Sequence, residues 1–154
     1  MGFESLNPNA MNSITLGHLN YLAVIVCTLA YFILGALWFS PVLFSNSWMA
    51  GHGISIPNSD ADKARMRKEM PKQLAITFSL CLIGTIAIAY FEAAFGISNW
   101  MTGCKLGIFA GIFAFIAIAL SHVYTRKSLK LVLIDAGYHI VSLIIVATVL
   151  AVWR

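Results

Sequence analysis

Charged side chains are scarce in this chain: only 10% of its 154 residues are Asp, Glu, Lys or Arg, whereas 60% are hydrophobic. A soluble domain is usually about a quarter charged, because its surface faces water. Too few charges remain here for such a surface, so lipid must surround most of the exterior. The polar stretches are too short to fold separately, and we expect one membrane domain over residues 1–154.

Cysteine is scarce as well. Cys27, Cys81 and Cys104 lie in or beside apolar segments, and their odd number and unpaired spacing exclude a disulfide framework. The sequence also lacks a nucleophile–base pattern, a phosphate-binding glycine loop and a CxxC motif. These absences leave an enzyme without positive support, and we predict no bound cofactor and no metal site.

The net charge of +4 does not indicate a nucleic-acid-binding protein. The basic residues cluster in short segments beside apolar runs, as in membrane flanks. Nucleic-acid binding needs a basic face, and single-strand binding adds interleaved exposed aromatic residues. The sequence contains no such face, so we exclude nucleic acid as a partner and expect the lipid bilayer instead.

Four long apolar runs dominate the chain, at about 19–39, 73–95, 103–123 and 131–153. Each has about 20 residues, and at 1.5 Å per residue this length matches a hydrocarbon layer about 30 Å thick. One such helix could be buried in a soluble protein, but four in succession leave nothing to bury them. The sequence therefore predicts an all-α integral membrane bundle of four transmembrane helices.

The basic residues predict the orientation of these helices. Eight of the ten fall in the two connections on one side of the membrane, namely Lys63, Arg65, Arg67, Lys68, Lys72, Arg126, Lys127 and Lys130. Only Lys105 and Arg154 fall on the other side. Because cytoplasmic loops carry the excess of Lys and Arg, we expect both basic loops in the cytoplasm and both termini outside.

The cytoplasmic loop 40–72 has two predicted helices. Ser40 and Pro41 resemble an N-cap followed by proline at the first helical position, which predicts a short interfacial helix that stops at Gly51. Ser59 and Asp62 resemble a capping box that opens a charged helix before Pro71. Trp48 is the expected anchor at the inner interface, with Trp100 and Trp153 at the outer one, and His52 is expected to be solvated.

The third apolar run carries a strip of small residues. Gly103, Gly107 and Gly111 recur every four residues and are followed by Ala114. Without side chains to hold helices apart, another backbone can approach this strip closely. The partner of the strip, within the chain or in a second copy, stays open.

The fourth run contains the polar residues that we consider functional. Asp135 and His139 are four residues apart and share a helix face that Ser142 continues. A carboxylate inside the apolar layer needs a partner, a proton or water. Because the turn between the third and fourth helices is short, His122 should lie opposite Asp135. Further members of this expected cluster are Tyr138 and Trp38.

Several interpretations of this cluster remain open. It can be a proton- or ligand-responsive site. It can also be structural, with Asp135 paired to Arg126, Lys127 or Lys130 and His139 bonded to a backbone carbonyl. Two histidines and one carboxylate could hold zinc or iron, but no tight local spacing supports a metal. At the other end of the bundle, we expect a surface ion pair between Glu92 and Lys105.

Three motifs give the chain a family resemblance. They are HLNYLAV at 18–24, GALWFSP at 35–41 followed by Leu43, Phe44 and Trp48, and LKL at 129–131 with IDAGYH at 134–139. Together they resemble a family of small bacterial membrane proteins that is known only as a domain of unknown function, over about 17–153. The resemblance implies a four-helix membrane fold in the cytoplasmic (inner) membrane and implies no activity.

Three functional hypotheses follow. The first is an oligomeric unit that binds or passes a proton or small solute at the Asp135/His139 region, since four helices alone enclose little aqueous space. The second is a structural or accessory subunit that packs in a larger membrane assembly through the glycine strip. The third is a membrane enzyme that acts on a lipid or quinone beside Trp38.

Overall fold

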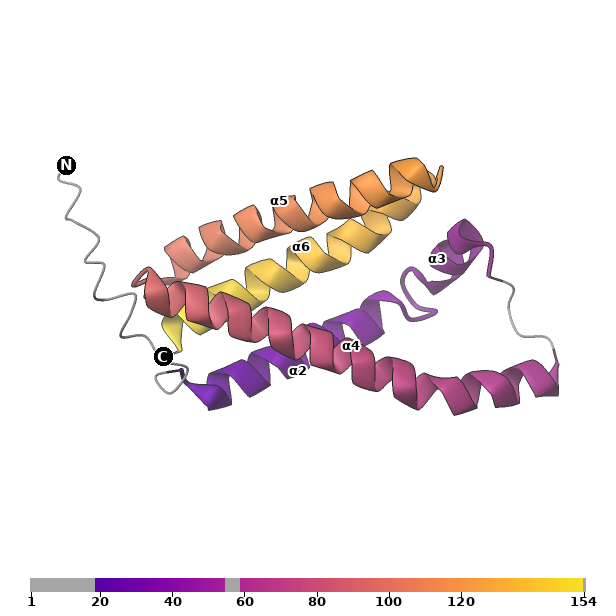
Figure 1. Ribbon diagram of the computed structural model, residues 1–154, viewed down its shortest axis with the longest axis horizontal. Helices are drawn as coiled ribbons and strands as arrows, with labels where there is room; N and C mark the ends of the chain where they lie inside the picture. The colour runs from indigo at the N-terminus through magenta and orange to yellow at the C-terminus, as the bar shows by residue number, and fades with distance from the viewer. Residues whose placement is uncertain (1–18, 55–58, 154) are drawn as a thin grey trace.

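Residues 19–54 and 59–153 are described in this computed structural model, and they form five α-helices and no strand (Figure 1). The helices are α2 (Tyr21–Trp38), α3 (Ser45–His52), α4 (Asp60–Ala94), α5 (Trp100–Tyr124) and α6 (Leu129–Val152). All but α3 are long and apolar enough to cross a membrane. The predicted all-α architecture with four spanning helices is confirmed. The two ends of the chain, 1–18 and 154, lie outside the described residues.

Each spanning helix begins at a polar cap. The side chains of Asn20, Ser59, Asn99 and Ser128 accept a hydrogen bond from a backbone N–H in the first turn of α2, α4, α5 and α6. The first backbone N–H groups of a helix have no partner within it, so each cap satisfies one of them. The capping residues thus set the helix starts, and α5 begins three residues earlier than predicted.

The sequence predicts that the charged helix ends before Pro71, but the structure shows otherwise. It continues through Pro71 into the second span, so α4 is a single helix of 35 residues. Proline removes one backbone hydrogen bond, which leaves the carbonyl of Arg67 without its helical donor. All residues from Ala61 to Ile76 are exposed, and a solvated carbonyl at this level costs little.

The short helix α3 also differs from its prediction. It begins at Ser45, because residues 41–44 form a turn in which Ser40 O accepts bonds from Leu43 N and Ser45 N. Ser40 is therefore not its N-cap. The helix runs through Gly51 and ends at Gly53, which has a φ of +72° that few other residues adopt.

The glycine strip joins α5 to α6 within the chain. A Cβ atom at Gly107 would lie 2.5 Å from Ile144 Cα, and one at Gly103 would lie 2.5 Å from Ala147 O. Gly111 faces Ile140 in the same way, whereas Ala114 is only half-buried. Two antiparallel backbones therefore run in direct contact along α5 and α6 (Figure 1), and the strip is occupied by the chain itself.

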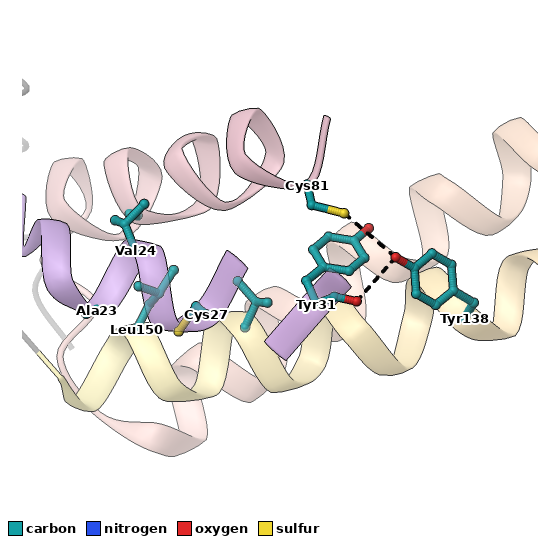
Figure 2. Close-up of a cluster of buried hydrophobic side chains, with 9 residues drawn as sticks. Ala23, Val24, Cys27, Tyr31, Cys81, Tyr138 and Leu150 are labelled. Carbon is teal, nitrogen blue, oxygen red and sulfur yellow. Dashed lines mark hydrogen bonds between the residues drawn. The ribbon is translucent and has the colours of Figure 1, made fainter. Parts of the chain in front are cut away.

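The remaining core lies between α2, α4 and α6. Ala23, Val24 and Cys27 of α2 meet Leu150 of α6 at one end of this core. Figure 2 shows that Tyr31, Cys81 and Tyr138, from three different helices, meet at its other end. Small and aromatic side chains thus fill the space between these helices.

The surface of the bundle is apolar. On α5, Phe109 and Phe113 are 64% and 72% exposed. On α4, Leu80 and Ile83 are each 63% exposed. Water would penalise so much exposed apolar area, so the fold is that of a multi-pass membrane protein.

The glycine contacts predict unequal effects of one substitution. Gly107→Ala should lower the free energy of unfolding in detergent by about 1–3 kcal/mol, because its Cβ overlaps the α6 backbone. Gly84→Ala is the matched control, since a Cβ at Gly84 meets no atom within 4 Å. Unfolding by sodium dodecyl sulfate titration measures both, and equal stability of the two variants would contradict the close approach.

Candidate functional site

The carboxylate of Asp135 lies near the N-terminal end of α6 and is held by two hydrogen bonds. Its Oδ2 lies 2.9 Å from His122 Nε2, and its Oδ1 accepts a hydrogen bond of 2.9 Å from Trp48 Nε1. The side chain is only 16% exposed. Hydrogen bonds from α5 and α3 thus replace the water that a carboxylate loses on burial.

The tight turn between α5 and α6 places His122 opposite Asp135. It spans 125–128, and Arg126 adopts a left-handed conformation with a φ of 52°. His122 in the last turn of α5 and Asp135 in the second turn of α6 therefore stand at the same depth, as the short turn leads one to expect.

The short helix α3 closes the site at the end of the bundle where the α5–α6 turn lies. Trp48 and His52 are four residues apart and share one face, and their rings are in tilted contact with centroids 4.6 Å apart. Lys127 donates a hydrogen bond of 3.1 Å to Gly51 O at the end of α3. Lys127 therefore binds α3, in contrast to the alternative in which it pairs with Asp135.

His122 has one proton whose position the geometry constrains. Its Nδ1 lies 3.0 Å from Ile118 O, and because a carbonyl oxygen only accepts, Nδ1 must carry a hydrogen. Its Nε2 faces Asp135 Oδ2, so the bond between them needs one further proton, on either atom. The tautomer of His122 is thus fixed by the backbone.

The sequence predicts that His52 is solvated, but its side chain is partly buried. Its Nε2 is buried and lies 3.5 Å from Asp135 Oδ2, but the geometry is not that of a hydrogen bond. Within the described residues this nitrogen has no hydrogen-bond partner. The ligand atoms of His52, His122 and Asp135 all lie within 4.8 Å of one another, which makes these three the candidate metal ligands of the described chain.

A pocket of about 510 Å³ opens beside this carboxylate. Its walls come from all five helices and are formed by Tyr31, Phe39, Trp48, His52, Thr77, Leu80, Cys81, Gly84, Ile118, Ser121, His122, Asp135, Tyr138, His139 and Leu143. Thr77, Leu80 and Ser121 are exposed, so the mouth lies between α4 and α5. The ionisable groups His52, His122, Asp135 and His139 are only partly exposed and form the inner wall.

The second histidine of the α6 face has a different partner from the first. His139 Nδ1 and the Tyr31 hydroxyl share a hydrogen bond of 2.8 Å, so His139 is not bonded to a backbone carbonyl through this nitrogen. The Tyr138 hydroxyl donates to Tyr31 O at 3.4 Å and lies 3.8 Å from Cys81 Sγ (Figure 2). A tyrosine pair therefore lines the deeper part of the pocket.

Two residues assigned to the cluster from sequence bond to backbone instead. Trp38 Nε1 donates to Ile134 O at 3.0 Å, and Ser142 Oγ donates to Tyr138 O at 2.7 Å. Trp100 and Trp153 lie at the other end of the bundle with exposed side chains, whereas Trp48 turns its N–H toward Asp135. Trp48 and Tyr31 are thus polar partners of the site that sequence patterns did not identify.

A second carboxylate is buried at the opposite end of the bundle. Glu92 is 2% exposed and lines a small pocket of about 90 Å³ with Asn20 and Trp153, whereas Lys105 is exposed. The expected surface ion pair of Glu92 and Lys105 is therefore wrong, because Glu92 lies on the inner face of α4. Its position near the helix end had suggested a surface residue.

Four helices that are long and apolar enough to cross a membrane, around a mostly apolar pocket with a few polar groups, define a multi-pass α-helical membrane protein. The chain belongs to the family described as "Protein of unknown function (DUF1761)", which matches residues 22–151. The expected resemblance to a family of unknown function is confirmed. No curated protein and no solved structure matches the chain. Its chemistry must therefore be argued from the site.

Proposed function

We propose that this protein binds a small solute inside the membrane, in the pocket between α4 and α5. The observation that carries the proposal is the pocket of about 510 Å³ with Asp135 in its wall. Ligand sites are typically concave, mostly apolar and about 300–1,000 Å³ in volume, with a few convergent polar groups that orient the ligand. Asp135 and the adjacent histidines supply those groups.

The lining favours a solute with an apolar body and one polar end. Leu80, Ile118 and Leu143 with the surrounding aromatic rings suit an apolar body, whereas Asp135, His122 and His139 suit a hydrogen-bonding or cationic group. The mouth faces sideways between two spanning helices, so such a solute can enter from the bilayer. A bare proton would need none of this space, and we therefore favour a solute over a proton.

Passage of the solute across the membrane would require more than one copy of the chain. Four helices enclose little interior, and the pocket opens on one side of the bundle. We propose a homo-oligomer as the unit of any permeation, in keeping with the closed symmetric assemblies common among oligomers.

An enzyme that acts on a lipid or quinone would use the same mouth, and a co-purifying lipid would favour it.

The accessory-subunit hypothesis receives less support. It requires the glycine strip of α5 to be open to a partner protein. Gly103, Gly107 and Gly111 face the backbone of α6 in the same chain, and no room remains there for another helix.

We place the protein in the cytoplasmic (inner) membrane with α3 and the start of α4 on the cytoplasmic side and both termini outside. Lys63, Lys68 and Lys72 are exposed on the part of α4 that precedes its apolar span, and Lys105 is exposed at the other end of the bundle. This distribution supports the positive-inside arrangement.

A membrane-impermeant amine reagent tests this orientation. Inverted vesicles should be labelled at Lys63, Lys68 and Lys72, and sealed right-side-out vesicles at Lys105. The reagent cannot cross the membrane, so it reaches only the outward-facing side of each vesicle. Peptide mass mapping identifies the modified lysines, and each vesicle type serves as the control for the other. Labelling of Lys63 in right-side-out vesicles would reverse the proposed orientation.

Filling the pocket should abolish solute binding. Gly84 lines the pocket, and a Cβ there meets nothing within 4 Å, so Gly84→Phe should occupy the cavity without disturbing the helix contacts. Small amphipathic amines and aromatic alcohols are screened for thermal stabilisation of the protein in detergent. A ligand at a hundredfold excess over its Kd stabilises by about 2.7 kcal/mol.

The matched control is Ile83→Phe, one residue away and facing outward. Compounds that stabilise the wild type should stabilise Ile83→Phe equally and Gly84→Phe little. If the active compounds stabilise both variants alike, the pocket is not the binding site.

A further inference from the structure

We propose that His52, His122 and Asp135 form a binding site for one divalent transition-metal ion at the inner wall of the pocket. The inference goes beyond solute binding and is tested without any solute. It starts from three ligand atoms, two imidazole nitrogens and one carboxylate oxygen, that all lie within 4.8 Å of one another.

The spacing of these atoms suits a common centre. Asp135 Oδ2 lies 2.9 Å from His122 Nε2 and 3.5 Å from His52 Nε2. Bonds of about 2.0–2.1 Å in a tetrahedral site separate neighbouring ligands by about 3.3 Å. To match this spacing, the first separation would widen and the second would narrow by a few tenths of an ångström, and the His52–His122 separation, which is within 4.8 Å, would adjust as the ion is bound.

The outer atoms of two ligands are already engaged, as in metal sites. His122 Nδ1 donates to Ile118 O, which leaves the lone pair of Nε2 for a metal. Trp48 Nε1 donates to Asp135 Oδ1, which leaves Oδ2 free to bind. Ligating histidines and carboxylates are usually oriented by such second hydrogen bonds.

His52 supplies a second observation that points to a ligand. Its Nε2 is buried, points at the carboxylate and forms no hydrogen bond within the described part of the chain. A buried polar atom without a partner costs about 1–3 kcal/mol. A bound ion would satisfy this nitrogen and would replace the proton between His122 and Asp135.

The donor set limits the kind of ion. Imidazole nitrogens with one carboxylate suit zinc, iron and related first-row ions, whereas calcium and magnesium take oxygen ligands. Among the residues that the structure describes, three protein ligands come together here, and the pocket adjoins them. The remaining coordination position therefore faces the pocket, as in sites where the metal exchanges a water or a ligand.

Zinc binding to the purified full-length protein in detergent tests the site. Equilibrium dialysis with elemental analysis should give one Zn²⁺ per chain in the wild type, with no competition from excess Mg²⁺ or Ca²⁺. His52→Phe retains a ring against Trp48 but removes the nitrogen, and affinity should fall by about 100-fold or more, since even outer-shell losses cost about 10- to 100-fold.

Two further variants complete the experiment. Asp135→Asn serves as the test if His52→Phe does not fold. It can keep both hydrogen bonds, by accepting from Trp48 and donating to His122, yet its affinity for Zn²⁺ should fall to a similar extent. His139→Gln is the control in the same pocket and should change affinity less than about threefold. Zinc X-ray absorption should show only nitrogen and oxygen ligands.

Absence of stoichiometric Zn²⁺ in the wild type, or equal affinity in wild type, His52→Phe and Asp135→Asn, would overturn the inference. A Zn–S distance of about 2.3 Å would also overturn it, by placing the ion on a cysteine. None of these results bears on the proposal of solute binding in the pocket, because that proposal is tested separately by Gly84→Phe.

Discussion

The need to satisfy one carboxylate in an apolar helix organises the end of this protein at which α3 and the α5–α6 turn lie. Asp135 cannot face acyl chains without a cost of a few kcal/mol, so donors from other helices must reach it. His122 of α5 shares a hydrogen bond with it, and Trp48 of α3 donates another. The short helix α3 has little apolar surface of its own, and these contacts hold it against the bundle. The hydrogen bond from Lys127 to Gly51 O at its end is a further contact.

The pocket is a consequence of how unevenly the helices pack. The glycines of α5 allow its backbone to lie directly on α6, and the core residues hold α2 between α4 and α6. The facing sides of α4 and α5 then leave a space, which Gly84 does not fill. Tight packing on one side of α6 and open space on the other therefore place Asp135 and His139 at a cavity wall.

Much of the architecture was predictable from the sequence, because lipid imposes simple rules. Four runs of about 20 apolar residues can only be helices in a bilayer, and the short turn after α5 was enough to place His122 opposite Asp135. Local rules were less reliable in the loop. Pro41 and Pro71 suggested a helix start and a helix end, but exposed backbone tolerates proline inside α4, and a turn takes up Pro41.

The partners of the site that lie far away in sequence could not be predicted. His52 reaches Asp135 only because α3 folds back under α6, and no spacing in the sequence records that contact. Trp48 resembled an interfacial anchor because its indole suits both roles, and Glu92 resembled a surface residue because it is near a helix end. In each case the three-dimensional neighbour decided the role of the side chain.

The central claim, that protein contacts hold Asp135, is tested most directly by a double-mutant cycle. The free energies of unfolding of Asp135→Leu, His122→Leu and the double variant are compared with that of the wild type in one detergent. Each single change leaves a buried polar group without its partner. The free energy of unfolding of the double variant should therefore fall by less than the sum of the two single losses, by about 0.5–3 kcal/mol. Losses that add up would show that the two side chains do not interact, and would contradict the account.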